Sequence, residues 1–126
     1  MSLRTPLANA RGLGSAKQGT EHFWHQRLTA VILVPLTLWF TTSLFLMSAM
    51  DYNAMITWIS SPINTVLLLV FIISAYYHAM LGVRVVIEDY IHSEWQKISC
   101  LILVNVLVLL AGLVAILSVL KIFLGL

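Results

Sequence analysis

The sequence predicts an all-α membrane protein with three transmembrane helices, because it is highly apolar and its few charges are widely spaced. Of its 126 residues, 60% are hydrophobic and 10% are charged, whereas a soluble domain of this size carries about 25% charged residues. The charges leave three gaps, each long enough for the ~20 apolar residues that cross a bilayer. These gaps run from Arg27 to Asp51, from Asp51 to Arg84, and from Lys97 to Lys121. The apolar runs do not alternate strictly with polar residues, so helices are expected rather than the strands of a barrel.

Each charge-free gap predicts one helix. The helices are expected at about residues 28–50, 63–87 and 98–120, within a transmembrane anchor domain over residues 22–126. The stretch "DYNAMITWISSP" between the first two is expected to be an interfacial loop. The polar, glycine-containing residues 1–21 are expected to form a flexible tail on the cytoplasmic side.

The basic residues predict the orientation of the chain. Six of the seven lie before the first helix or around the second loop, and only Lys121 lies near the opposite end. Because short cytoplasmic loops carry the excess of Lys and Arg, the N-terminus is expected in the cytoplasm, or in the matrix of a mitochondrion. The expected location is the bacterial inner membrane, or the mitochondrial inner membrane if the protein is organellar. A net charge of +2 gives no indication of nucleic-acid binding.

His78 is the most informative polar residue because of its depth. It lies ten residues before Glu88, so it is ~15 Å inside the cytoplasmic end of the second helix, about half of a ~30 Å core. An ionisable residue at that depth indicates a functional site, although a neutral histidine bonded to a neighbouring helix also explains it. Gly82 and Asp89 share its helix face. A glycine one turn away leaves room for close helix packing or for a flat ligand such as a haem bound axially by His78.

A second axial ligand for such a haem is not expected from this chain. His22 and His25 precede the first predicted helix and His92 follows the second, so all three are expected at or outside the membrane surface. His78 would be ~15 Å deeper, beyond the reach of these side chains. A haem would therefore be shared with a partner subunit that has its own transmembrane helices.

Three further polar residues each allow two interpretations. Arg27, at the start of the first predicted helix, either extends its charge to lipid phosphates or pairs with a haem propionate. Asp89 and Tyr90 are either an ordinary polar helix end or a binding site at the membrane boundary. In a binding site, Tyr90 would donate a hydrogen bond to a small polar head group, and Asp89 would orient that group or relay protons.

Two stretches carry a resemblance to a known family. "HAMLGVRVVIEDY" resembles the second-helix signature of the small, cytochrome b556-type membrane-anchor subunit of succinate dehydrogenase, respiratory complex II, with His78, Gly82, Asp89 and Tyr90 at the signature positions. "GTEHFWHQRLTAVILVPLTLWF" resembles the family's entry into the first helix, with Arg27 as its arginine. The resemblance implies that His78 is one axial ligand to the iron of haem b and that Gly82 gives the haem clearance. It also implies that Arg27 lies near the propionates and that Tyr90, beside Asp89, hydrogen-bonds ubiquinone.

The resemblance implies a specific place in an enzyme. The subunit would share haem b with a larger cytochrome b subunit and would dock the iron–sulfur and flavoprotein subunits to the membrane. The succinate-oxidising site would lie outside this chain. Two alternatives remain open: the anchor of a fumarate reductase or other cytochrome b dehydrogenase, and a cofactor-free assembly or transport protein. The last would place polar residues along several helices, whereas here they cluster on one.

Overall fold

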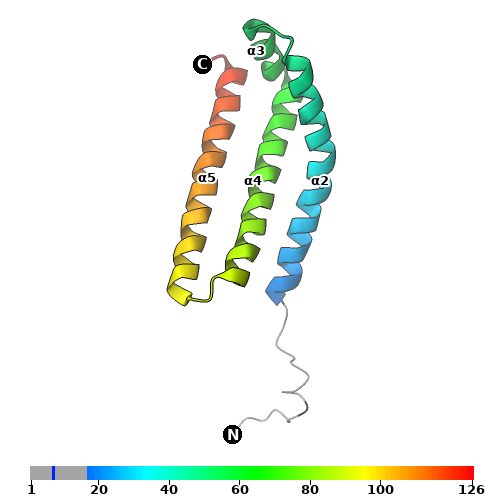
Figure 1. Ribbon diagram of the computed structural model, residues 1–126. Helices are drawn as coiled ribbons and strands as arrows, with labels where there is room; N and C mark the ends of the chain where they lie inside the picture. Colours follow the sequence, from blue (N-terminus) through cyan, green and yellow to red (C-terminus); the bar gives the residue numbers. More distant parts are fainter. Residues whose placement is uncertain (1–6, 8–16) are drawn as a thin grey trace.

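Three long helices lie side by side and one short helix covers one end. The computed structural model describes Leu7 and residues 17–126, with the backbone alone at 17–19. The elements in chain order are α2 (Lys17–Met47), α3 (Tyr52–Ser60), α4 (Pro62–Tyr90) and α5 (Glu94–Leu124). Figure 1 shows α4 between α2 and α5, with α3 at the end where α2 finishes. The prediction of an all-α protein with three spanning helices is confirmed.

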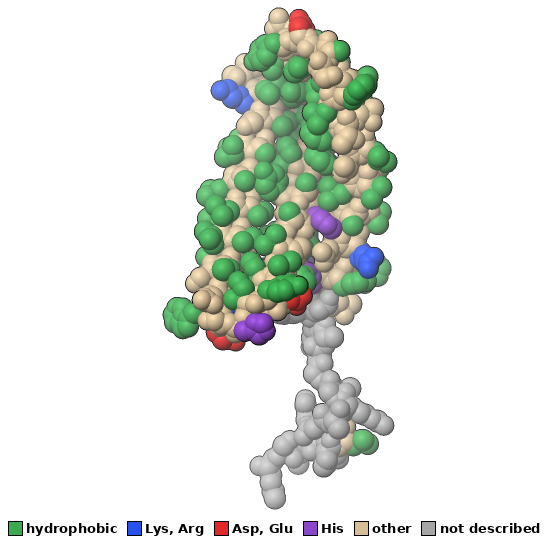
Figure 2. All heavy atoms as spheres, viewed as in Figure 1, with side chains coloured by type: hydrophobic (Ala, Val, Ile, Leu, Met, Phe, Trp, Pro, Cys, Tyr) green, Lys and Arg blue, Asp and Glu red, His purple; other side chains and the backbone are tan. Residues whose placement is uncertain are grey.

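The long helices have the length and the surface of membrane spans. Those long and apolar enough to cross a bilayer are Thr20–Met47, Pro62–Tyr90 and Glu94–Leu124. A helix of 29 residues such as α4 measures about 44 Å, more than the ~30 Å hydrocarbon core. The hydrophobic side chains that are buried number only four among the described residues: Leu36, Leu68, Leu81 and Ile87. Figure 2 shows apolar side chains distributed along the whole length of the visible helices, which suits contact with lipid and with other transmembrane helices.

The first long helix begins earlier than predicted. The helix starts at Lys17 rather than near residue 28, a difference of about 16 Å along its axis. The expectation of a flexible tail is therefore wrong for residues 17–21, and the rest of that tail lies outside the described residues. A helix satisfies its backbone groups internally, so α2 can continue through polar sequence beyond the apolar run. As a result, residues of α2 lie beside other residues of α4 than the sequence predicted.

The predicted interfacial loop is mostly helical. Asp51 caps α3, and its side chain accepts a hydrogen bond of 2.9 Å from the backbone N–H of Ala54. Trp58 of α3 stacks on Trp39 of α2, with ring centroids 5.7 Å apart. The side-chain amide of Asn64 in α4 donates to the Trp58 carbonyl over 2.8 Å. These contacts tie α3 to the adjoining ends of α2 and α4.

Aromatic and small residues fit the central helix between its neighbours. Phe40 of α2 stacks on Phe71 of α4, with centroids 4.7 Å apart. Gly112 of α5 is buried, and a Cβ there would lie 3.7 Å from the ring of Tyr76 on α4. A glycine facing a ring lets two helices approach closely, as is common in membrane proteins. Both flanking helices therefore hold α4 in a fixed rotation, which decides where its polar residues point.

Candidate functional site

His78 faces α2 and meets Thr29. The Nδ1 atom of His78 lies 2.9 Å from Oγ1 of Thr29. Thr29 follows the first residue of α2 by twelve positions, and His78 precedes the last residue of α4 by twelve, so each is about 18 Å from the same end of the antiparallel pair. One interpretation of His78 was a hydrogen bond to a neighbouring helix, and that bond is present. Its Nε2 atom has no hydrogen-bond partner among the described residues, and the side chain is only half-buried.

The histidines of α2 lie closer to the level of His78 than predicted. The hydroxyl of Tyr77 lies 3.1 Å from Nδ1 of His25, so His25 is level with the neighbour of His78 rather than ~15 Å from it along the helices. His22 is also inside the helix, and its Nε2 is buried with no hydrogen-bond partner among the described residues. The prediction for these two was wrong because it took the first helix to begin about 16 Å further along. His92 is exposed beyond the end of α4, as expected.

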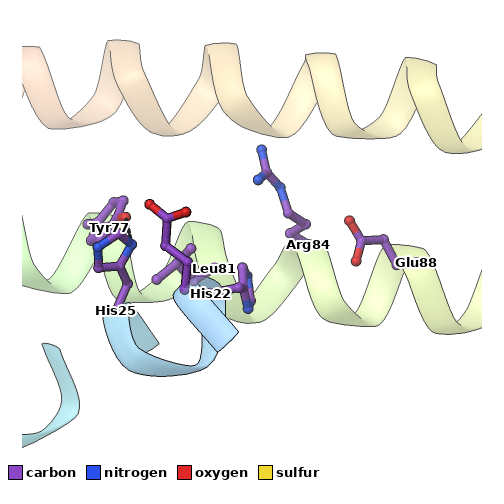
Figure 3. Close-up of a pocket in the computed structure, with 7 residues that line it drawn as sticks. His22, His25, Tyr77, Leu81, Arg84 and Glu88 are labelled. Carbon is purple, nitrogen blue, oxygen red and sulfur yellow. Dashed lines mark hydrogen bonds between the residues drawn. The ribbon is translucent and has the colours of Figure 1, made fainter. Parts of the chain in front are cut away.

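An open pocket of about 570 Å³ lies between α2 and α4, near the end where α2 begins (Figure 3). Its lining residues are Glu21, His22, His25, Tyr77, Leu81, Arg84 and Glu88. His78 and Gly82 each follow a pocket-lining residue of α4 by one position, so they lie about 100° around the helix from the face that lines the pocket. His25 therefore lines the pocket, whereas His78 lies beside it on a different face of α4. Among the described residues, no group of three or more His, Cys, Asp or Glu side chains is placed to hold a metal ion.

Gly82 places no side chain in the helix turn that follows His78. A Cβ at Gly82 would make an ordinary contact of 3.9 Å with the side-chain nitrogen of Gln26 on α2. A planar macrocycle ligated by Nε2 of His78 would need little side-chain bulk beside the imidazole. His78 therefore fits the role of a haem ligand, because its Nε2 has no hydrogen-bond partner among the described residues and the next turn carries a glycine.

This chain does not bring Arg27 to His78. The guanidinium carbon of Arg27 lies 5.0 Å from the centroid of the Phe23 ring, a cation–π distance. Arg27 precedes Thr29 by two residues, so it points about 160° away from the side that meets α4. It stands ten residues inside α2 rather than at its mouth. Arg27 is exposed and available to groups outside the chain, and both predicted roles remain predictions.

Asp89 and Tyr90 form the exposed end of α4. Tyr90 is the last residue of the helix and is 79% exposed, and its hydroxyl has no hydrogen-bond partner among the described residues. Asp89 is exposed beside it and makes no ion pair within the described part of the chain. Trp95, at the start of α5, is 83% exposed at the same end. These side chains are available to a molecule or subunit outside the chain.

Two residues of α2, Thr29 and Gln26, were not predicted from the sequence. Each contacts the signature helix, Thr29 at His78 and Gln26 at Gly82. A threonine or glutamine in an apolar run gives no sign of its partner. The pairing becomes visible only when the start of α2 and the end of α4 are both known.

Comparison with known proteins gives consistent results. The family model described as succinate dehydrogenase/fumarate reductase transmembrane subunit matches residues 1–120. A succinate dehydrogenase hydrophobic membrane anchor subunit of Rickettsia bellii is 40% identical over 116 residues, which cover 92% of this chain and 87% of that protein. The corresponding subunit of Paracoccus denitrificans is 30% identical over 93 residues, 74% of this chain and 72% of that protein. The succinate dehydrogenase membrane anchor subunit of Reclinomonas americana is 30% identical over 95 residues, 72% and 78% of the two chains. No solved structure gives a significant match.

Proposed function

Because the chain belongs to the succinate dehydrogenase/fumarate reductase transmembrane subunit family, we propose that it is the haem-bearing anchor of a succinate:ubiquinone oxidoreductase. Its relatives are named membrane anchor subunits of succinate dehydrogenase, and its three long apolar helices provide the membrane span. The partners in this proposal are a cytochrome b subunit, an iron–sulfur subunit and a flavoprotein subunit. In this proposal succinate is oxidised in the soluble subunits, and this chain contributes the membrane anchor.

The haem assignment is supported most by the surroundings of His78. One ring nitrogen is hydrogen-bonded to Thr29, the other has no partner among the described residues, and Gly82 adds no side chain in the next turn. His78 would hold the iron of haem b on one side, and a residue of the cytochrome b subunit would hold it on the other. Bound haem b would supply an iron centre that exchanges one electron at a time. Arg27 projects from α2 within a turn of the level of Thr29, where its guanidinium would pair with a propionate between the subunits.

The quinone assignment is supported by the free hydroxyl of Tyr90. The tyrosine ends α4, and twelve residues of helix rotate it about 120° from His78. It therefore serves a site beside the haem rather than the haem itself. Its hydroxyl would donate a hydrogen bond to a carbonyl of ubiquinone, and Asp89 would hold or relay a proton at the same end.

An anchor subunit of fumarate reductase is the nearest alternative, and it differs from the proposal in the direction of the catalysed reaction. The matching family includes the transmembrane subunits of fumarate reductases, and the same helices would suit an anchor in either enzyme. In this proposal the end where α2 begins lies in the cytoplasm, or in the matrix of a mitochondrion, which the excess of basic residues at that end supports. The soluble subunits would dock at this end, next to Tyr90 and Asp89.

Purification through a tag on this chain tests the proposal. We expect succinate oxidation coupled to quinone reduction, together with the reduced-minus-oxidised spectrum of a b-type haem, in the purified complex. Coupled activity without a haem spectrum would overturn the haem assignment and leave the anchor role. Purification of the chain with neither activity nor haem would favour a cofactor-free membrane protein.

A further inference from the structure

Thr29 bonds to His78 and also to two carbonyls of its own helix. Oγ1 of Thr29 lies 2.8 Å from the backbone carbonyl of His25 and 3.0 Å from that of Gln26, besides 2.9 Å from Nδ1 of His78. The hydroxyl carries one proton, and a carbonyl can only accept. When that proton is donated to a carbonyl of α2, the oxygen of Thr29 is left to accept, and only a protonated Nδ1 of His78 can donate to it.

Burial makes this arrangement persistent. Thr29 is 8% exposed, whereas its partner ring is half-buried. Bonds from a threonine hydroxyl to carbonyls three and four residues earlier are common in helices, because one favoured side-chain rotamer forms them. The hydroxyl is therefore held by its own helix, and it offers its oxygen to the imidazole from a fixed place.

We propose that Thr29 is a positioning residue for His78, accepting a hydrogen bond from Nδ1–H and thereby presenting the lone pair of Nε2 to the haem iron. This inference rests on the proposed function, since it assumes that His78 is an axial ligand. A metal-bound histidine usually donates its second ring N–H to a carboxylate, a carbonyl or water, which fixes the tautomer and the ring plane and raises the basicity of the ligand. Here a hydroxyl oxygen of the neighbouring helix takes that role.

Two consequences follow for the bound haem. A more basic axial ligand favours the ferric state, so loss of the bond raises the midpoint potential of the haem. If ferric binding weakens tenfold relative to ferrous binding, the potential rises by about 59 mV, the value of a tenfold change for one electron. A ring without its hydrogen-bond partner is also free to turn about its own axis, which alters the electron paramagnetic resonance (EPR) g-values of the ferric haem. Loss of such outer partners weakens metal binding about 10- to 100-fold in other proteins.

The test compares three variants in the purified complex. Thr29→Val keeps the shape of the side chain and removes the hydroxyl, Thr29→Ser keeps the hydroxyl, and Thr42→Val is the matched control. Thr42 is an exposed residue of α2 whose hydroxyl donates to its own helix, at the carbonyl of Leu38. We expect Thr29→Val to raise the midpoint potential, shift the ferric g-values and speed haem loss about 10-fold or more. Thr29→Ser should stay close to the unmodified complex, and Thr42→Val should match it.

Unchanged g-values and midpoint potential in Thr29→Val would overturn the inference. If that variant does not assemble, Thr29→Ala removes the same hydroxyl with a smaller side chain, and unchanged values there would have the same meaning. His78→Ala, measured in parallel, separates this inference from the proposed function. A haem spectrum unaffected by His78→Ala would remove the ligand assignment itself. An altered spectrum in His78→Ala with no effect of Thr29→Val would overturn only the role of Thr29.

Discussion

Removal of one hydroxyl group from the end of α4 should slow quinone reduction without disturbing the fold. In the chain, the Tyr90 side chain is 79% exposed and its hydroxyl bonds to no described residue, so Tyr90→Phe removes no contact that holds the helices together. Any loss then reports on a molecule bound at this end. A hydrogen bond to a neutral acceptor contributes about 0.5–1.5 kcal/mol, which corresponds to about a twofold to thirteenfold lower rate. The loss is larger if negative charge develops on the carbonyl oxygen during reduction.

The assay follows succinate oxidation in the purified complex with two electron acceptors. With a ubiquinone analogue, Tyr90→Phe should be slower by the factor above. With an artificial acceptor that takes electrons directly from the soluble subunits, its rate should be unchanged. Tyr52→Phe is the matched control, because Tyr52 is 75% exposed at the opposite end of the helices. Equal rates in Tyr90→Phe and the unmodified complex with both acceptors would refute the quinone role, and equal losses with both would indicate a role in assembly.

Two further predictions concern packing and topology. Gly112→Ala should keep or raise the thermal stability of the complex, because its Cβ would make an ordinary 3.7 Å contact with Tyr76 and alanine favours a helix by roughly 1 kcal/mol over glycine. Gly112→Phe should lower that stability by separating α5 from α4. A complex that is more stable with Gly112→Phe than with Gly112→Ala would contradict the packing. In a Cys100→Ser background, thiol reagents should label Ser93→Cys from the cytoplasmic side and Leu126→Cys from the other, because α5 spans the membrane between them; labelling of both from one side would contradict the topology.

The number and order of the membrane helices could be predicted from the sequence because charges are excluded from the hydrocarbon core. Arg27, Asp51, Arg84 and Lys97 delimit the apolar runs, and each run became a helix. The helix ends could not be read from those charges, since a helix continues into water wherever its backbone bonds are internal. Residues 17–21 were expected to belong to a tail, yet they form the first turns of α2. The short helix α3 had a sequence signal, Asp51 as its N-cap.

The candidate site was predicted on one helix and missed on its neighbour. His78, Gly82 and Tyr90 could be placed because their spacing along a single helix fixes their relative directions. The contact of Thr29 with His78 depends on how far α2 extends past the membrane, and a helix that began near residue 28 would have put Thr29 about 16 Å away along the axis. The same error placed His25 ~15 Å from the level of His78, whereas it contacts Tyr77. To predict a contact between two helices, one must know how they are aligned along their axes. The spacing of residues within one helix does not give that alignment.

The measurement that tests the central claim most directly is the reduced-minus-oxidised spectrum of the complex purified with His78→Ala. His92→Ala is its control, since His92 is exposed beyond the end of α4 and has no place in the proposed haem site. We predict that the b-type spectrum is lost or altered in His78→Ala, because one axial ligand is removed, and that it is unchanged in His92→Ala. An identical haem spectrum and haem content in His78→Ala and the unmodified complex would contradict the claim that this chain ligates haem.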